Sequence, residues 1–343
     1  MDDYLEGKNM ENNESKVKTS YPQDWVAYNL AQTQEKILFM ELLYELTSLI
    51  PQPKRNGAGR PSANLGEMVF ACCLKTYLDF SSRRTESDLK LAQQLGYITH
   101  TPHFNTILKY LKNPLLKEIL TKLITISSLP LKEVEENFTV DATGFSTSRF
   151  ERWVNNIRYK KKKTRLFRKA HVMSGVKTNV ITHIEVTDAY IHDSLIFPSL
   201  VKNTAKYFEM KEISADMGYS SRKNLTIVAQ YGAIPYIPFK KNATRRSRSA
   251  PIWHTMYNYF KSHKEEFMKH YHLRSNAESV FSMIKRKFGD YLRTKSKIAQ
   301  TNEILCKALC HNICVLIQEM FELGIRVDFQ DIVENQFMCK IEL

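Results

Sequence analysis

Three acidic residues stand where a sheet and a late helix could bring them together. Asp141 and Asp216 each follow a short apolar run, in VDAT and ISAD, and Glu278 lies in a helical segment near the C-terminal end. The position directly after apolar strand residues is an unusual place for a charged side chain that is merely solvated. Three carboxylates in one cleft need a compensating cation, and oxygen ligands suit Mg²⁺ or Mn²⁺. Two ions about 4 Å apart could activate an attacking oxygen and stabilise a leaving oxygen in phosphoryl transfer.

The helical segment YHLRSNAESVFSMIKRKFG surrounds Glu278 with further polar groups. At about 100° per residue, four side chains fall on one face within about 60°: Tyr271, Arg274, Glu278 and Lys285. Such a face could ligate a metal ion through its carboxylate while its cations bind phosphates on either side. The other face is apolar and can pack against a core.

The charge balance favours a polyanionic partner. The chain has 50 Lys and Arg against 36 Asp and Glu, a formal net charge of +14, which suits DNA, RNA or an anionic membrane. The run RYKKKKTRLFRK is the densest basic segment, and a second basic run follows at KKNATRRSR. Charge runs are usually solvated loops, but the first one falls between two predicted strands and close to Trp153 and Tyr159. We therefore expect contacts to a DNA backbone from five of its residues: Lys160, Lys161, Lys162, Lys163 and Arg165.

The elements that position the acids are predicted from residue 136 onward. Residues 136–145, 167–178 and 179–190 are rich in β-branched and aromatic residues, which indicates three strands, the last two joined in a hairpin about Lys177 to Asn179. A helix over 193–209, a strand over 211–216, a helix over 221–232 and a strand over 233–239 follow. This order describes a mixed α/β sheet flanked by helices, whose parallel strands would bring their carboxyl ends together. Residues 240–265 are treated as an insertion, after which helices resume near Lys269 and over 299–323.

The N-terminal third is predicted to be helical. Residues 1–20 look like a disordered tail, a helix spans 24–50, and a linker runs from Pro51 to Ser62. Four short helices follow, over 65–80, 85–95, 103–112 and 114–127. The second and third, with a turn at Gly96, have the outline of a helix-turn-helix, which either reads DNA or simply packs. The predicted domains are a helical domain over 21–130, a catalytic domain over 131–325 and a tail over 326–343.

Other residues that could hold a metal have simpler interpretations. Cys306, Cys310 and Cys314 recur every four residues beside His311, as expected for the buried face of a helix. Asp188 and Asp193 compete with the aspartates above, but we expect Asp188 in a turn and Asp193 as a helix cap. The N-terminus is polar and acidic and no apolar run approaches the ~20 residues that cross a bilayer, so we expect a cytoplasmic protein without membrane contact.

The residues around Glu278 resemble a known family. Tyr271, two residues, Arg274, three residues, Glu278, six residues and Lys285 are similar to the Y-R-E-K signature of bacterial and archaeal DDE insertion-sequence transposases. VDATGF, ADMGYSS, GAIPYIPFK and RTKSKIAQTNEILCKALCHNI resemble the flanking blocks of the same group. The resemblance covers roughly residues 60 to 320.

The resemblance implies a ribonuclease H-like core. The helical pattern of residues 21–130 adds the expectation of an all-helical N-terminal DNA-binding domain. Asp141, Asp216 and Glu278 would be catalytic acids that hold two Mg²⁺ ions, with Mn²⁺ as a substitute. Three residues would contact the ends of the element: Tyr271, Arg274 and Lys285. The enzyme would cut double-stranded DNA at those ends, join the freed 3′-hydroxyls to target DNA, and act as a homodimer on DNA. Two alternatives remain open: a structure-selective nuclease without strand transfer, and a non-catalytic DNA-binding regulator derived from a transposase.

Overall fold

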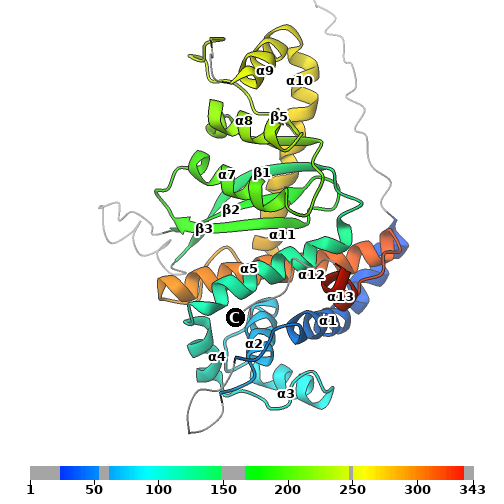
Figure 1. The fold of residues 1–343 in the computed structure, drawn as a ribbon. Coiled ribbons are helices and arrows are strands. Elements are labelled where there is room, and N and C mark those ends of the chain that lie inside the picture. Colours follow the sequence, from blue (N-terminus) through cyan, green and yellow to red (C-terminus); the bar gives the residue numbers. More distant parts are fainter. Residues whose placement is uncertain (1–23, 54–61, 148–166, 247–249, 336–343) are drawn as a thin grey trace, which may run out of the picture.

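A five-stranded mixed sheet forms the centre of the chain. The structure, a computed structural model, describes residues 24–53, 62–147, 167–246 and 250–335 (Figure 1). The strands are β1 (Asn137–Ser146), β2 (Phe167–Gly175), β3 (Ile181–Asp188), β4 (Glu212–Ala215) and β5 (Ile234–Tyr236). Their order in the sheet is β3-β2-β1-β4-β5. The predicted mixed sheet flanked by helices is confirmed, and it is consistent with a ribonuclease H-like domain.

The directions of the strands follow from how they are connected. β1, β2 and β3 are antiparallel neighbours, and the turn between β2 and β3 uses Asn179 at a φ of 66°, a conformation that asparagine tolerates well. β4 and β5 are reached through helices and lie parallel to β1. β1 therefore has an antiparallel neighbour on one side and a parallel neighbour on the other.

Helices α7 (Asp193–Thr204) and α11 (Ser275–Phe288) lie on opposite faces of the sheet. On β1, Asp141 and Thr143 contact side chains of η3 and α11, whereas His171, whose Cα pairs with that of Ala142, contacts the start of α7. Successive residues of a strand point to opposite faces, so the two helices cannot share one. Figure 1 shows α7 in front of the sheet and α11 behind it.

After β4 the chain forms a helix and then returns to the sheet as β5, as predicted. Asp216 caps the short 3₁₀ helix η2 (Met217–Tyr219), and Ser221 caps α8 (Arg222–Gln230) by accepting a hydrogen bond from the Asn224 amide. The chain leaves α8 through Gly232, whose φ of +79° suits a residue without a side chain.

The N-terminal helices share their core with a helix from near the C-terminal end. The bounds are α1 (Trp25–Ser48), α2 (Leu65–Tyr77), α3 (Glu86–Gln94), α4 (Phe104–Leu111), α5 (Leu115–Ser128), η1 (Leu129–Leu131), α12 (Lys297–Glu322) and α13 (Phe329–Asn335). α12 packs against α1, α2 and α5 and also reaches β3, while α13 contacts α1 and α5. Figure 1 shows α5 and α12 crossing below the sheet, with α1 and α2 beyond them. α12 therefore joins the sheet to the helical part.

Buried polar groups fix α12 in this position. Asn312 accepts a hydrogen bond from the Ile181 amide (2.8 Å) and donates to the carbonyls of Ile181 and Ile124 and to Ser127 Oγ. His311 Nε2 lies 2.9 Å from the Asn179 carbonyl. Cys306 and Cys310 are fully buried in the core, as expected for structural cysteines. α12 is long and apolar enough to cross a membrane, but 78% of its apolar window is buried inside the protein, which is consistent with a soluble protein.

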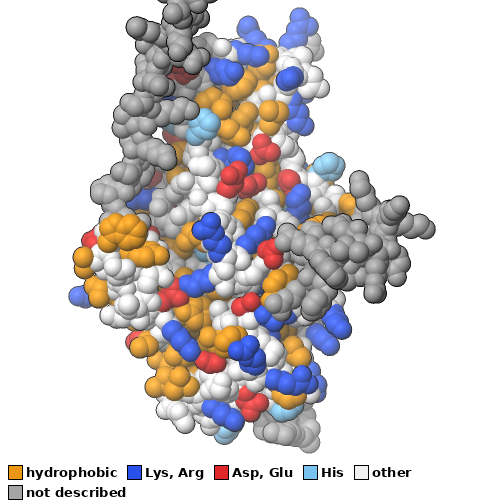
Figure 2. Space-filling view, turned by 180° about the vertical axis from the view of Figure 1, so that it is seen from behind, with side chains coloured by type: hydrophobic (Ala, Val, Ile, Leu, Met, Phe, Trp, Pro, Cys, Tyr) orange, Lys and Arg blue, Asp and Glu red, His pale blue; other side chains and the backbone are white. Residues whose placement is uncertain are grey.

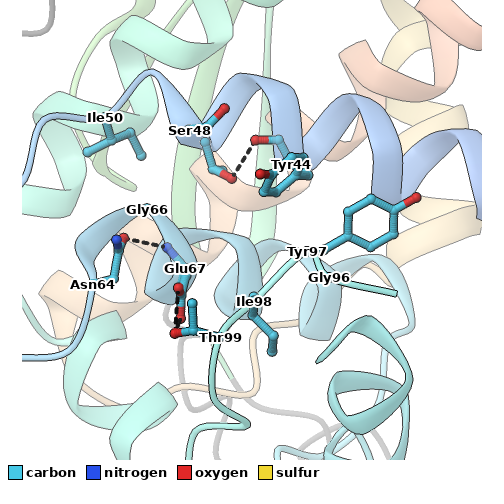
Figure 3. A pocket seen from close by; sticks show the side chains of 11 residues that line it. Tyr44, Ser48, Ile50, Asn64, Gly66, Glu67, Gly96, Tyr97, Ile98 and Thr99 are labelled. Carbon is cyan, nitrogen blue, oxygen red and sulfur yellow. Dashed lines mark hydrogen bonds between the residues drawn. The ribbon is translucent and has the colours of Figure 1, made fainter. Parts of the chain in front are cut away.

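The predicted helix-turn-helix consists of α3 and α4. The chain leaves α3 through Gly96, which has a φ of +84°, and Figure 3 shows the following residues lying against α1 and α2. There Thr99 Oγ1 donates to the Glu67 carboxylate (2.9 Å), at the edge of a pocket of about 220 Å³. The connection therefore packs against its own helical neighbours, and the DNA-reading role of α4 stays a prediction.

The segment treated as an insertion contains a helix of its own. α9 (Pro251–Ser262) is followed directly by α10 (Lys264–Tyr271), so helices resume earlier than the predicted Lys269. Phe239 packs edge-on against Trp253 and Tyr257, and Phe260 against Phe267. These aromatic contacts give the end of the molecule beyond β5 a small core.

Candidate active site

The sheet register brings Asp141 and Asp216 to neighbouring positions. Val140 of β1 pairs with Ala215 of the parallel strand β4, and the two aspartates directly follow these residues, Asp141 within β1 and Asp216 just after the end of β4. Adjacent strands lie about 4.8 Å apart. Asp141 accepts a hydrogen bond from the Ala142 amide (2.8 Å) and Asp216 from the Met217 amide (2.6 Å).

Arg274 joins the first aspartate to the helical glutamate. Its Nη1 lies 3.3 Å from Asp141 Oδ2, and its Nη2 lies 2.7 Å from Glu278 Oε1. Asp141 and Arg274 are mostly buried, whereas the Glu278 side chain is 62% exposed. One guanidinium therefore bridges carboxylates from β1 and α11.

The electrostatics of the site reflect this convergence. Burial raises the pKa of Asp141, and the charges of Asp216 and Glu278 raise it further, against the opposing effects of the Ala142 amide and Arg274. Burial opposes ionisation of Arg274, but four acidic groups around it raise its pKa: Tyr271, Asp141, Glu278 and Asp216. The three predicted acids thus influence one another, with a cation among them.

The helix that carries Glu278 is interrupted before that residue. α10 ends at Tyr271, the 3₁₀ helix η3 covers His272–Arg274, and α11 begins at Ser275. The prediction of one continuous helix is wrong here. Asn276, in the first turn of α11, donates to the Val176 carbonyl and thereby fixes the new helix to the β2–β3 turn. Tyr271 still lies beside Arg274, with 5.9 Å between the ring centroid and the guanidinium carbon.

Lys285 of α11 contacts the strand of Asp141 two residues farther along. Its Nζ donates to Thr143 Oγ1 (2.6 Å) and lies 5.7 Å from the centre of the Phe145 ring. Burial lowers the pKa of Lys285, although Asp290 opposes that effect. Arg274 and Lys285 therefore contact the side of β1 that faces α11, and Glu278 and Tyr271 lie beside Arg274.

Tyr219 is a neighbour of the site that the sequence reasoning did not single out. Its hydroxyl is buried and has no hydrogen-bond partner among the described residues. Burial raises its pKa, as do the charges of Asp193, Asp141 and Asp216. The segment ADMGYSS, which follows β4 directly, was the only signal that could have found it.

The two competing aspartates lie away from Arg274. Asp188 is the last residue of β3 and pairs with Arg168 and Lys297. Asp193 pairs with Lys169 and lies 3.4 Å from His171 Nδ1. It is the first residue of α7 and His192 precedes it as the cap position, so the prediction of a capping role for Asp193 is wrong.

The chemistry of the three carboxylates suits a divalent cation. All three candidates offer hard oxygen donors, which Mg²⁺ and Mn²⁺ prefer. In the described ranges, no group of three or more His, Cys, Asp or Glu side chains is arranged tightly enough to hold a metal ion. Arg274 supplies the balancing positive charge between Asp141 and Glu278.

The predicted basic segment cannot be placed relative to these residues. Lys160, Lys161, Lys162, Lys163 and Arg165 lie outside the described residues. Figure 2 shows Lys and Arg side chains spread over the rear face from one end to the other, with acidic side chains among them. On that face the positive charge comes from separate residues and does not form one continuous patch.

Comparison with known proteins agrees with this geometry. The family model described as "Transposase DDE domain" matches residues 134–313, which span the whole sheet, η3, α11 and part of α12. A protein of Archaeoglobus fulgidus named "Probable transposase for insertion sequence element ISA1214" is 26% identical over 276 residues, 80% of this chain and 81% of the relative. No solved structure gives a significant match. Transposases act on DNA, and enzymes with this domain generally use divalent metals such as Mg²⁺. Since the matched region is more than half of the 343 residues, the chain belongs to the transposases with a DDE domain.

Proposed function

We propose that this transposase cleaves the ends of its insertion sequence and joins the 3′-hydroxyls to target DNA. The observation that carries the proposal is the bridge from Arg274 to Asp141 and Glu278, next to a strand register that sets Asp216 beside Asp141. The three acids come from β1, the end of β4 and α11. Far-separated parts of the chain thus supply one set of oxygen donors.

The roles of the residues follow from their chemistry. Asp141, Asp216 and Glu278 would hold two Mg²⁺ ions, which when bound would activate the attacking oxygen and stabilise the leaving oxygen. Arg274 can donate two parallel hydrogen bonds to a phosphate, because its planar guanidinium matches two oxygens at once. Tyr271 orients Arg274, and Lys285 offers a second cation for the DNA backbone. The basic residues Lys160, Lys161, Lys162, Lys163 and Arg165 would extend this contact, and two copies would pair the two ends.

A cleavage experiment tests the assignment of the acids. Duplex DNA carrying an element end is incubated with Mg²⁺ and wild-type protein or one of three variants: Asp141→Asn, Asp216→Asn and Glu278→Gln. Each variant should lose cleavage by at least about 10³-fold, because each removes a charged ligand from a shared site, and should keep most of its DNA affinity, which comes from the cations.

Asp188→Asn is the matched control. It removes an acid from the same sheet whose partners are Arg168 and Lys297, and it should cleave like wild type. Normal cleavage by any of the three acid variants would refute the assignment. A protein that nicks ends but gives no joined product would instead be the nuclease without strand transfer, and one that binds ends without cutting them would be the regulator.

A further inference from the structure

A pocket lined by basic and apolar side chains lies where the helical part meets the segment that follows α11. It has a volume of about 260 Å³ and is lined by residues of α2, the α2–α3 connection, α4 and the segment before α12. The lining residues that carry the argument are Lys75, Arg83, Phe104, Asn105 and Arg293. It is separate from the carboxylates of the candidate active site.

Lys75 is the unusual member of this pocket. Its residue is only 3% exposed, and within the described ranges no carboxylate or hydrogen-bond acceptor partners its ammonium. Burying an unpaired charge is costly, so a buried ammonium that lines a pocket favours an anion in that pocket.

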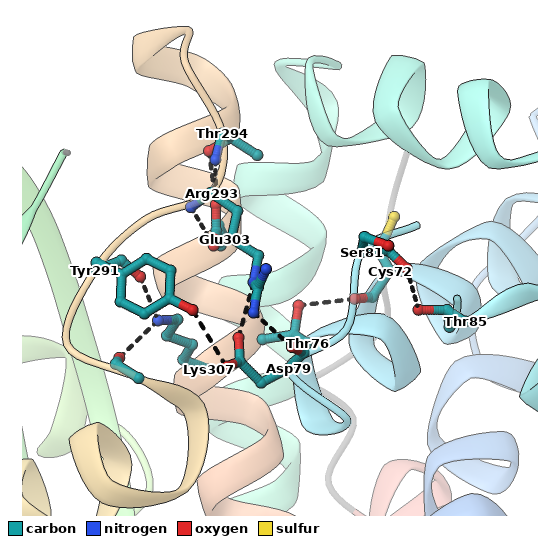
Figure 4. Close-up of polar contacts among 11 residues, drawn as sticks. Cys72, Thr76, Asp79, Ser81, Thr85, Tyr291, Arg293, Thr294, Glu303 and Lys307 are labelled. Carbon is teal, nitrogen blue, oxygen red and sulfur yellow. Dashed lines mark hydrogen bonds and ion pairs between the residues drawn. The ribbon is translucent and has the colours of Figure 1, made fainter. Parts of the chain in front are cut away.

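The two arginines add to the positive charge. Arg83 forms no ion pair with any described residue, and its guanidinium carbon lies 4.6 Å from the centre of the Phe104 ring. Arg293 is held in place by Asp79: its Nε lies 2.9 Å from Oδ1, and its Nη2 donates to the Asp79 carbonyl (Figure 4).

The acids near the pocket are already engaged. Asp79 accepts from Arg293, and Glu303 accepts from the amides of Arg293 and Thr294 and from Thr294 Oγ1 (Figure 4). Lys307 adds another cation behind them and donates to the carbonyls of Gly289 and Tyr291. The charge that remains uncompensated is that of Lys75 and Arg83.

The pocket lies beyond the end of the strand that carries Asp141. Along β1, Asp141 is followed by Thr143, the partner of Lys285, and then by Ser146, which hydrogen-bonds to Asp290 and Leu292. Arg293 is the next residue. Five residues of strand span about 17 Å, comparable to about five base pairs of a duplex.

We propose that this pocket binds one backbone phosphate of the DNA whose end lies in the candidate active site, with Lys75 as its buried partner. The identity of the DNA rests on the proposed function, whereas the preference for an anion rests on the pocket. A phosphate fits because it offers several acceptor oxygens to Lys75 and Arg83 and to the Asn105 amide. The site would fix the position of the duplex relative to the acids.

The test compares two lysine variants. Lys75→Met removes the buried charge and keeps the length of the side chain, and Lys90→Met removes an exposed lysine of α3 that pairs with Glu86. Binding of end DNA is measured without Mg²⁺ at several salt concentrations. Lys75→Met should bind about tenfold more weakly and lower the slope of log affinity against log salt by about 1, as expected for one lost phosphate contact. Lys90→Met should change affinity less than about twofold.

Single neutral methylphosphonate linkages then locate the phosphate. In wild type, the neutral linkage at one position should reduce the affinity about tenfold. In Lys75→Met, the linkage at the same position should cause no further loss of affinity. The proposal is overturned if Lys75→Met and the methylphosphonate reduce the affinity independently, so that their losses multiply, at every position of the linkage. It is also overturned if a Lys75→Met protein with a normal melting temperature binds DNA as wild type does. Inorganic phosphate alone could stabilise wild type against thermal unfolding without stabilising Lys75→Met. If the two proteins then bind DNA equally well, the pocket belongs to a small anion and the proposal is overturned. Because binding is measured without cleavage, failure here leaves the assignment of the acids unaffected, and the reverse also holds.

Discussion

At the scale of single residues, the ion pairs of Arg274 compete with the DNA contact that we propose for it. In the structure its guanidinium is engaged by Asp141 and Glu278, the same oxygens that would hold divalent ions and lie close to a DNA phosphate. A cation fixed beside metal ligands repels a second cation, by several kcal/mol at 4 Å in a partly buried site. The residue that we propose as a DNA contact should therefore weaken metal binding in the free protein.

The variant Arg274→Ala should separate these effects. Without DNA, its Mn²⁺ affinity should rise on the order of tenfold, because the competing charge is gone, while its cleavage of end DNA should fall. Calorimetry gives the Mn²⁺ affinity, and a gel assay gives the cleavage. Lys285→Met serves as the control, because its ammonium is held by Thr143 and its loss should leave Mn²⁺ affinity nearly unchanged. Weaker Mn²⁺ binding by Arg274→Ala would contradict this account.

The two aspartates could be found from sequence because their positions depend on local patterns. An apolar run followed by one Asp indicates the end of a buried strand, and the parallel register then makes Asp141 and Asp216 neighbours. Tyr219 could not be found in this way. Its closeness to Asp193 and Asp141 depends on how η2 and α7 pack, and no spacing in the sequence encodes that packing.

At the scale of elements, most strands and helices were predictable and the interruption at η3 was not. Periodicity identified β1 to β5, since alternation and β-branched residues reflect burial directly. The break between α10 and α11 falls in a segment without proline or glycine, so no residue type in the sequence predicts it. Arg274 and Lys285 of the segment nevertheless contact the same side of β1. The Y-R-E-K assignment and the predicted domain boundaries stay predictions.

α12 also carries a buried acid whose titration should be measurable. Burial, together with Glu322 and Glu135, raises the pKa of Glu319 from 4.5 to about 7. Between those values the folded chain holds a proton that the unfolded chain releases, so this residue lowers stability above pH 7 and ceases to do so as the pH falls toward 4.5.

The variant Glu319→Gln should accordingly be more stable than wild type at pH 8, on the order of 1–3 kcal/mol, and nearly equal to it at pH 5. Urea unfolding at both pH values measures the difference. Glu209→Gln is the comparison variant, because Glu209 is exposed and is not among the groups that raise the pKa of Glu319, so its loss should have a much smaller effect. An equal gain at both pH values would show that protonation of Glu319 is not the cause.

At the scale of the whole molecule, the net charge of +14 should dominate the affinity for DNA. Proteins that neutralise several phosphates release bound counterions, so their affinity falls linearly with salt on a logarithmic scale. Between 50 and 200 mM salt we expect a loss of about 10²-fold or more, measured by fluorescence anisotropy with end DNA. A random duplex of the same length should show a similar slope. An affinity that hardly changes over this range would remove the electrostatic part of the DNA-binding argument.

The position of α12 has a consequence for how the chain is made. α1, α2 and α5 emerge from the ribosome well before residues 297–322, yet they pack against one another around that late helix. Domains normally fold as units, with the N-terminal one first during translation. Here these helices keep an apolar side exposed until residues 297–322 have been made, so a product that stops before residue 297 lacks the helix that completes their core.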